Sequence, residues 1–413
     1  MITGLALLIA HAVVSQSSTT ALLNGVSCPT PSNCMAVGAQ NTGSSPARPL
    51  AEHWDGRGWS VERVPLPPVA NDAYISLTRV ACPTAMRCVT VGRSETGDGA
   101  SSRTFAEIWN GHGWSISLTL NPRHAGGADL LGVSCPAASS CFAVGDAIER
   151  ASERTLVEWW NGTVWRIIPS PNPSRPELNV GSQLAAVSYD DRLPSSTGPC
   201  SLIGKVGVLE GRGLARIGNH LCPVKVKPAQ PAQSLKVSAL VERWEGARWS
   251  IPRSANQQLG SGRENILQDV ACMRAANCFA VGTSVREGTG LGSDTTLRST
   301  TVIERRTGSG WTLAPRPGPW KYSGLSGVSC TQAGCVAVGS HGFDGEPNST
   351  VSWQLAEIWN GRSWSTMPGP TDPEVKGLAE VSCPRISACM AVGGNISELW
   401  RGHEWKVIPT PSL

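Results

Sequence analysis

The chain is built from a repeated segment, and this repeat restricts the possible folds more than any other feature of the sequence. Each unit reads L-x-x-V-S-C, then C-x-A-V-G, then L-A-E-x-W-N-G-x-x-W and a proline, with substitutions in individual units. Seven such units follow one another from about residue 20 to residue 413. Repeats of this kind are typical of architectures in which each unit buries its apolar surface against its neighbours.

Each unit contains four short apolar runs separated by turn residues; in the first unit they cover 21–28, 34–38, 50–54 and 58–64. Runs of this length, bounded by Gly, Pro, Asn and Ser, indicate strands. In the third run of the sixth unit, Leu355, Glu357 and Trp359 point to one face and Ala356 and Ile358 to the other, and both sets are mostly apolar. A strand covered on both faces fits a sheet packed between two others.

The sequence therefore predicts an all-β fold, a seven-bladed β-propeller with four antiparallel strands per blade. A linear solenoid is the alternative. The expected blades are at about 20–68, 69–122, 123–173, 174–256, 257–317, 318–370 and 371–413.

The order A-V-G followed by E-x-W-N-G-x-x-W resembles the repeats of kelch-type propellers and of the central domain of galactose oxidase. This resemblance covers nearly the whole chain and implies the propeller fold. The sequence departs from the family pattern because a single glycine, such as Gly38 or Gly92, ends the second strand where the family has a pair. It also adds two cysteines to each unit.

The cysteines indicate disulfides within the units. Fourteen cysteines divide into seven pairs, and in six of them four or five residues separate the two cysteines, across the turn between the first two strands. The fourth unit has Tyr189 in place of its first cysteine, so by elimination Cys200 pairs with Cys222. Each bond is expected to contribute about 2 kcal/mol on the chain-entropy model. The predicted pairs are Cys28–Cys34, Cys82–Cys88, Cys135–Cys141, Cys200–Cys222, Cys272–Cys278, Cys330–Cys335 and Cys383–Cys389.

Disulfides in every unit predict an oxidising compartment, so that the protein is secreted or exposed at the cell surface. Residues 4–14 form an apolar run too short to span a bilayer. We interpret residues 1–19 as a signal peptide or leader; the alternatives are an extra outer strand or a truncated start. Cysteine pairs on separate blades cannot converge on a zinc ion, and we predict neither a metal nor a cofactor.

Residues that recur in every unit are interpreted as parts of the blade. A glutamate on a buried strand face must have a partner, and we expect each to accept backbone N–H groups from a nearby turn. The tryptophan pairs are expected to pack between blades. The glutamates are Glu52, Glu107, Glu158, Glu242, Glu304, Glu357 and Glu398.

Residues outside the repeat are the candidates for a ligand site. The cysteine turns and the W-N-G turns lie at one end of every blade, whereas the variable loops lie at the other end, where binding sites concentrate. Two regions of these loops, around Tyr322 and around His341, carry aromatic and polar side chains. The candidates there are Trp320, Tyr322, His341, Phe343, Asp344 and Trp353. Their alternative role is to seal the loops against the blade.

A second group of candidates lies on the innermost strands. The residue before the conserved valine is small in four units and charged in three, as Arg79, Asp269 and Glu380. These charges can reach the central channel; an exposed rim or a satisfied ion pair is the alternative. The fourth unit also carries an insertion, which is either functional or drift in a tolerant loop.

The low formal net charge of +4 and the absence of a basic run argue against a nucleic-acid-binding surface. Enzyme motifs such as G-x-S-x-G and H-E-x-x-H do not occur. The sequence favours a monomeric binding protein for a protein or polysaccharide ligand, without a membrane span. A glycoside hydrolase or lyase with its site at the channel mouth is the first alternative, and a sensor or scaffold fragment of an envelope protein is the second.

Overall fold

The computed structural model describes most of the repeat region. The described residues are 19–42, 46–66, 74–96, 101–149, 152–172, 181–189, 200–209, 216–217, 220–221, 235–244, 249–250, 252, 255, 263–274, 277–286, 298–307, 310–318, 322–342, 352–369 and 377–411. Residues 1–18 of the predicted leader lie outside them, and Thr19 begins the first strand. No helix long and apolar enough to cross a bilayer occurs in these ranges.

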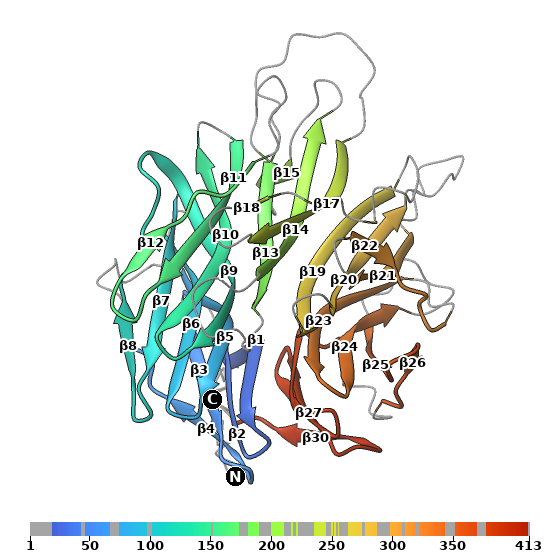
Figure 1. Cartoon of the computed structure of the whole chain (residues 1–413). Coiled ribbons are helices and arrows are strands. Elements are labelled where there is room, and N and C mark those ends of the chain that lie inside the picture. The colour runs from blue at the N-terminus through green and yellow to red at the C-terminus, as the bar shows by residue number, and fades with distance from the viewer. Residues whose placement is uncertain are drawn as a thin grey trace, which may run out of the picture.

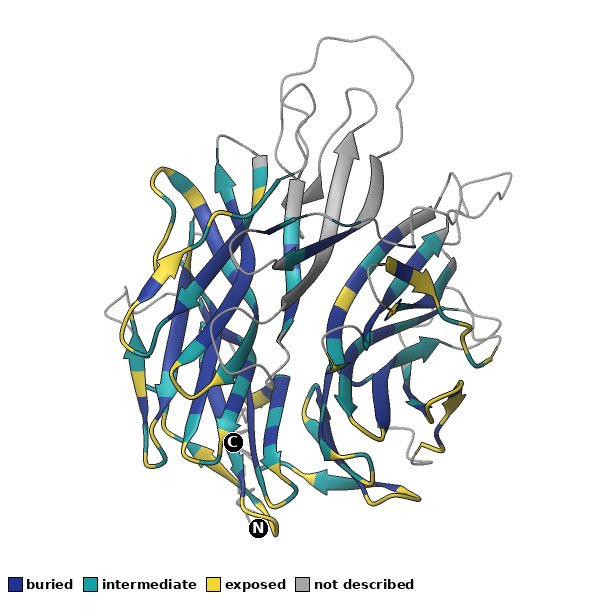
Figure 2. Ribbon diagram, in the orientation of Figure 1, coloured by how far each residue is buried: buried dark blue, intermediate teal, exposed yellow. Residues whose placement is uncertain are grey.

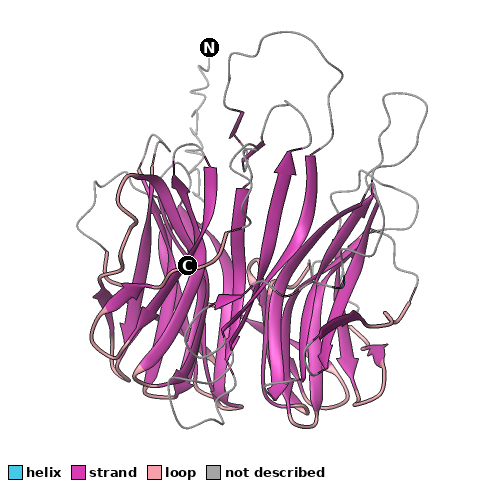
Figure 3. Cartoon of the chain, turned by 45° about the horizontal axis from the view of Figure 1, so that its top comes forward, coloured by secondary structure: helices cyan, strands magenta, loops and turns pink. Residues whose placement is uncertain are grey.

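The described residues form seven four-stranded antiparallel sheets (Figures 1 and 3), each with its strands in chain order. The first three are β1 (Thr19–Thr30), β2 (Asn33–Thr42), β3 (Arg48–Trp54) and β4 (Trp59–Glu62); β5 (Tyr74–Thr84), β6 (Arg87–Glu95), β7 (Ser102–Trp109) and β8 (Trp114–Ser117); and β9 (Ala125–Ala137), β10 (Ser140–Glu149), β11 (Ser152–Trp160) and β12 (Trp165–Ile167). The fourth is β13 (Gly181–Tyr189), β14 (Cys200–Leu209), β17 (Leu235–Trp244) and β18 (Trp249–Ser250). The last three are β19 (Arg263–Arg274), β20 (Asn277–Arg286), β21 (Arg298–Thr307) and β22 (Gly310–Leu313); β23 (Ser323–Thr331), β24 (Gly334–Gly342), β25 (Ser352–Trp359) and β26 (Trp364–Thr366); and β27 (Glu380–Arg385), β28 (Ala388–Gly393), β29 (Ile396–Trp400) and β30 (Trp405–Pro409).

The first strands of the sheets form a closed ring. Strand β1 contacts β5, β5 contacts β9, and the series continues through β13, β19 and β23 to β27, which contacts β1. At the point of closure, the backbone N–H of Leu23 donates to the carbonyl of Gly394 over 2.6 Å. This closure excludes the linear solenoid.

The prediction of a seven-bladed propeller is wrong, because only six of the four-stranded sheets are regular blades. The sheet of β13, β14, β17 and β18 departs from the repeat, although β13 occupies a place in the ring. Its outer strand has two residues, and its middle strands are separated by an insertion that carries a separate ribbon, β15 (Arg216–Ile217) and β16 (His220–Leu221). The physical reason lies in the fourth unit, where Tyr189 replaces the first cysteine and the insertion lengthens the middle connection.

Six disulfides close the first turns of the six regular blades, with Cα–Cα distances of 3.9–4.1 Å. They confirm the six predicted pairs with short spacing. Cys222 lies outside the described residues, so the Cys200–Cys222 pair stays a prediction. Structural disulfides in this number suggest an oxidising environment.

The apolar core is divided among the interfaces between neighbouring sheets (Figure 2). In the described residues, seven hydrophobic clusters each combine side chains from two successive sheets. One of them joins Met35, Val37 and Ala51 of the first blade to Phe105 and the tryptophan pair of the second. The tryptophans therefore do pack between blades, as predicted, and their rings also meet in pairs, with centroids 5.5–6.5 Å apart in five blades.

The W-N-G turn between the third and fourth strands has a direct physical explanation. The Oδ1 atom of Asn110 accepts the backbone N–H groups of His112 and Gly113, each over 3.0 Å, and Asp55, Asn161 and Asn360 form the same turn. Gly111 has a φ of 95°, a left-handed conformation that costs glycine little. The motif thus encodes the turn.

The glycine of A-V-G lets the second strand of a blade lie close to the innermost strand. A Cβ on Gly92 would lie 2.0 Å from the carbonyl oxygen of Ser76. The register shifts at this point, between Leu77 and Arg79, because Thr78 forms a bulge. The hydroxyl of Thr78 then donates to the carbonyl of Leu130 in the next blade over 2.7 Å. The glycine and the bulge together connect successive blades.

We predict that Gly92→Ala destabilises the protein by about 1–3 kcal/mol, because the added methyl group must displace backbone atoms. Gly113→Ala in the same blade is the matched control, since a Cβ there meets nothing within 4 Å. Its free energy of unfolding should change by less than about 1 kcal/mol. Thermal melts of both variants test this. Equal melting temperatures would contradict the close contact between Gly92 and the backbone of Ser76.

We also predict that peptide mapping without reduction recovers the six described disulfides together with Cys200–Cys222. Mapping with a thiol-alkylating reagent should label no cysteine of the folded chain. Free thiols throughout, or bonds between different blades, would contradict both the pairing and the oxidising compartment.

Candidate functional site

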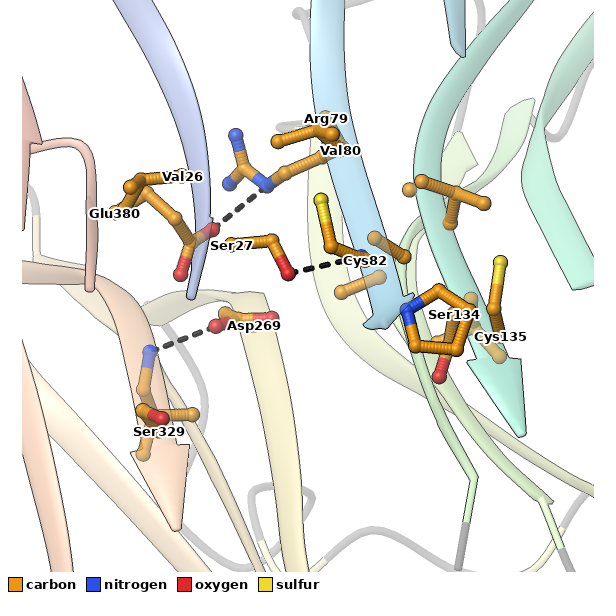
Figure 4. A pocket seen from close by; sticks show the side chains of 17 residues that line it. Val26, Ser27, Arg79, Val80, Cys82, Ser134, Cys135, Asp269, Ser329 and Glu380 are labelled. Atoms are coloured by element: carbon orange, nitrogen blue, oxygen red, sulfur yellow. Dashed lines mark hydrogen bonds and ion pairs between the residues drawn. The ribbon is translucent and has the colours of Figure 1, made fainter. Parts of the chain in front are cut away.

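A pocket of about 380 Å³ lies in the central channel, where the innermost strands approach their disulfide turns (Figure 4). Its lining includes Arg79, Asp269 and Glu380, the three charged residues that were predicted to lie on these strands. It also includes Cys82, Pro83 and Cys135, which puts the pocket toward the disulfide end of the channel, away from the variable loops. The other described lining residues are Val26, Ser27, Val80, Ala81, Gly132, Val133, Ser134, Ala186, Val187, Val328 and Ser329.

The structure brings Arg79, Asp269 and Glu380 together, although they come from β5, β19 and β27. The Nε atom of Arg79 lies 2.8 Å from Oε2 of Glu380. Its Nη1 atom donates to the carbonyl oxygens of Asn24 over 2.8 Å and of Thr78 over 3.1 Å. Both carboxylic side chains are nearly buried, whereas the Arg79 side chain keeps 21% of its surface exposed.

The two carboxyl groups form a hydrogen-bonded pair. Asp269 also accepts the N–H of Val270 over 2.8 Å and that of Val328 over 2.7 Å. Glu380 accepts the N–H of Val381 over 3.0 Å. Every carboxyl oxygen is therefore engaged.

Burial determines the protonation of this pair. It raises the pKa of Asp269 to about 6, although the neighbouring Arg79 opposes the change. Burial and the negative charge of Asp269 together raise the pKa of Glu380 well above its usual value. Both shifts favour a protonated form of the pair, in which one proton lies between the two carboxyl groups.

The small residues at the same position of other blades leave room for these long side chains. A Cβ on Gly25 would lie 3.0 Å from the Cα of Arg79, and one on Gly327 would lie 2.8 Å from Oε1 of Glu380. The side chain of Asp269 thus extends from β19 past Gly327 of β23 toward Glu380 of β27. The side chain of Arg79 extends from β5 past Gly25 of β1 to the same glutamate. The alternation of small and charged residues builds one cluster across five blades.

The variable-loop candidates lie at the opposite end of the sixth blade. His341 and Trp353 are directly paired on β24 and β25. The carbonyl of Tyr322 accepts the N–H of Gly342 over 2.8 Å, and Tyr322 itself has a φ of 56°. All three side chains are partly exposed. Trp320, Phe343 and Asp344 lie outside the described residues.

The seven repeated glutamates are buried, with side chains exposed by 1% or less. Leu120 donates its N–H to Glu158, and Ala255 to Glu304, each over 3.0 Å and from the loop that enters the blade. Both oxygens of Glu52, Glu107 and Glu357, by contrast, accept no hydrogen bond from the described residues. The prediction of backbone partners therefore holds for Glu158 and Glu304 and fails for these three.

The repeated serine of V-S-C connects neighbouring blades, a role that was not predicted from the sequence. The Ser27 hydroxyl accepts the N–H of Cys82, and Ser329 accepts that of Cys383, each over 2.9 Å and across a blade boundary. Ser382 and Cys28 form the same bond at the ring closure. The recurrence of the serine was the available signal. No group of three or more potential metal ligands is present in the described ranges.

The comparisons with known proteins show the fold and no family. The sequence matches no protein-family model, and no curated protein is significantly similar to it. YCF48 bound to a D1 peptide gives a TM-score of 0.47 at 12% identity, covering 96% of this chain and 94% of that chain. A polysaccharide lyase of family PL25, an ulvan lyase, superposes with a TM-score of 0.55 at 7% identity, covering 95% of this chain and 97% of the lyase. The same lyase bound to -[GlcA(1-4)Rha3S]- gives a TM-score of 0.53, again at 7% identity, with the same two coverages. The similarity to the lyase supports the propeller fold and does not show the kelch-like family.

We predict that the buried glutamates make the protein less stable as pH rises. Burial raises the pKa of Glu52, Glu158 and Glu357 to about 7 and that of Glu107, Glu242 and Glu398 to about 8. Because these values exceed the ordinary value of 4.5, the stabilisation is complete below pH 4.5 and is lost as pH rises through 7 to 8.

Thermal melts should therefore show a lower melting temperature at about pH 8.5 than at about pH 5. Glu107→Gln removes one titrating group and should reduce the difference. A melting temperature that is constant or higher at the alkaline pH would contradict the prediction.

Proposed function

We propose that the protein is a secreted, monomeric binding propeller that takes a polysaccharide or protein ligand on its variable-loop face. The observation that carries the proposal is the grouping of Tyr322, His341 and Trp353 at this end of the sixth blade. They are partly exposed, whereas most repeated tryptophans are buried in the interfaces. Exposed aromatic rings held on a rigid strand pair suit stacking against sugar rings or apolar side chains.

The rigid frame supports this assignment. The six disulfides and the inter-blade hydrogen bonds hold the strands that carry His341 and Trp353 in place before a ligand arrives. A preformed site loses less conformational entropy on binding than a mobile one. The ligand classes named for the structural neighbours, a polysaccharide and a peptide, suggest the probes for a first screen.

A hydrolase or lyase is the second candidate, and the paired carboxyl groups of Asp269 and Glu380 favour it. Paired carboxyl groups are the usual acid and base of glycoside cleavage. The binding protein ranks first because every oxygen of this pair already accepts a backbone N–H group, the guanidinium of Arg79 or the shared proton. A catalytic pair needs an oxygen that can face the substrate.

We predict that Tyr322→Ala combined with Trp353→Ala weakens ligand binding at least about tenfold. Binding to a panel of glycans and peptides is measured by array and then by calorimetry. Replacing Trp353 should leave the melting temperature within a few degrees, because its side chain remains partly exposed.

The matched control is Asn360→Asp in the W-N-G turn of the same blade, which keeps the turn and lies at the other end. Loss of binding in Asn360→Asp with full binding in the double variant would place the ligand on the opposite face. Hydrolysis or elimination products from a polysaccharide, lost in Glu380→Gln, would instead favour the enzyme.

A further inference from the structure

The channel pocket has properties that the variable-loop site does not explain. Its volume of about 380 Å³ is at the lower end of the range for small-molecule sites. It is formed by the innermost strands, each of which contacts the innermost strands of both neighbouring sheets. Its shape is therefore set before any ligand arrives, and the question is which chemical groups it offers.

The pocket offers hydrogen-bond donors to a ligand. The hydroxyls of Ser27 and Ser329 already accept backbone N–H groups, so their protons are available to donate. In the described residues, the hydrogen bonds of Arg79 use Nε and Nη1, and none uses Nη2. Each oxygen of the two carboxyl groups already has a partner in the backbone or in Arg79. The donors of Arg79 and of the two serines therefore favour a ligand that supplies acceptors.

The charge of the pocket is balanced before a ligand binds. Arg79 on β5 is positive, and the pair of Asp269 on β19 and Glu380 on β27 shares one proton and one negative charge. The described lining from β1, β9, β13 and β23 consists of Val, Ser, Gly, Ala and disulfide-bonded Cys, with no other ionisable side chain. An anion would leave one uncompensated negative charge, which a second proton on the acid pair would neutralise.

We propose that the channel pocket is a second ligand site, which takes a small carboxylate and gains a proton on the Asp269–Glu380 pair as it does so. The carboxylate accepts hydrogen bonds from Arg79 and from the serine hydroxyls. The proton comes from solvent and stays on the acid pair while the ligand is bound. Affinity therefore rises as pH falls, because the protonated pocket binds the anion more tightly.

Calorimetry on the intact protein tests this with glucuronate and acetate as probes and glucose as the neutral control. Glucuronate should bind and glucose should not, and the affinity for glucuronate should rise severalfold from about pH 7.5 to about pH 5.5, with a limit of tenfold per pH unit for one proton. Titration in two buffers of different ionisation enthalpy should give different heats, since a proton is taken up. This measurement requires no variant.

Two pairs of variants complete the test. Arg79→Lys keeps the positive charge but loses the planar donor fork, and should weaken glucuronate binding at least about tenfold. Arg93→Lys is its control, because Arg93 also bridges blades, through Asp129 over 3.1 Å, but does not line the pocket. Asp269→Asn and Glu380→Gln should each flatten the pH dependence, and melting temperatures confirm that each variant is folded.

The proposal is overturned if neither carboxylate binds, if glucose binds as well as glucuronate, or if the heats are equal in both buffers. Equal weakening by Arg79→Lys and Arg93→Lys would also overturn it. The outcome is independent of the variable-loop site, because Tyr322→Ala with Trp353→Ala should leave glucuronate binding in the channel unchanged.

Discussion

Closure of the ring is the constraint on which the rest of the structure depends. A four-stranded sheet of this chain is apolar on both faces, and the clusters that bury those faces lie between sheets. The first sheet of the ring therefore requires the last sheet as much as the second. Besides their shared hydrophobic cluster, three hydrogen bonds of the described residues join them: Leu23 with Gly394, Ser382 with Cys28, and the indole N–H of Trp59, which donates to the hydroxyl of Ser397 over 2.9 Å.

The same constraint explains why charged side chains occur at the centre. Innermost strands approach closely, so glycine or alanine is required at most of the positions that face the channel. Where a neighbouring blade has glycine, a long side chain can extend over it. Arg79 and Glu380 meet across the first blade in this way, close to the closure of the ring. The cluster thus stabilises the closure and gives the pocket its polarity, so the two roles cannot be separated by removing a residue outright.

Much of the frame could be predicted from the sequence, because repetition reveals what each position does. The cysteine pairs, the four-strand units and the inter-blade tryptophans follow from patterns that seven units repeat. The predictions failed where the repeat pattern is weak or where two interacting residues are distant in sequence. Tyr189 marked the fourth unit as irregular, yet the length of its outer strand depends on packing. The glutamates were correctly placed in the interior, but only coordinates show that Glu107 has no hydrogen-bond partner among the described residues, whereas Glu158 accepts a backbone N–H.

The candidate site was predicted as a set of residues and not as an arrangement. Arg79, Asp269 and Glu380 stand out in sequence as charges at a position that is otherwise small. Their separation in sequence, however, gives no indication that they meet, and it hides the shared proton. The pocket is also at the disulfide end, where repeated turns suggested a purely structural role. Repetition identifies the residues that every blade needs. Where a few blades carry a different residue at a repeated position, however, the ring can bring those residues together. They then form a site that no single blade contains.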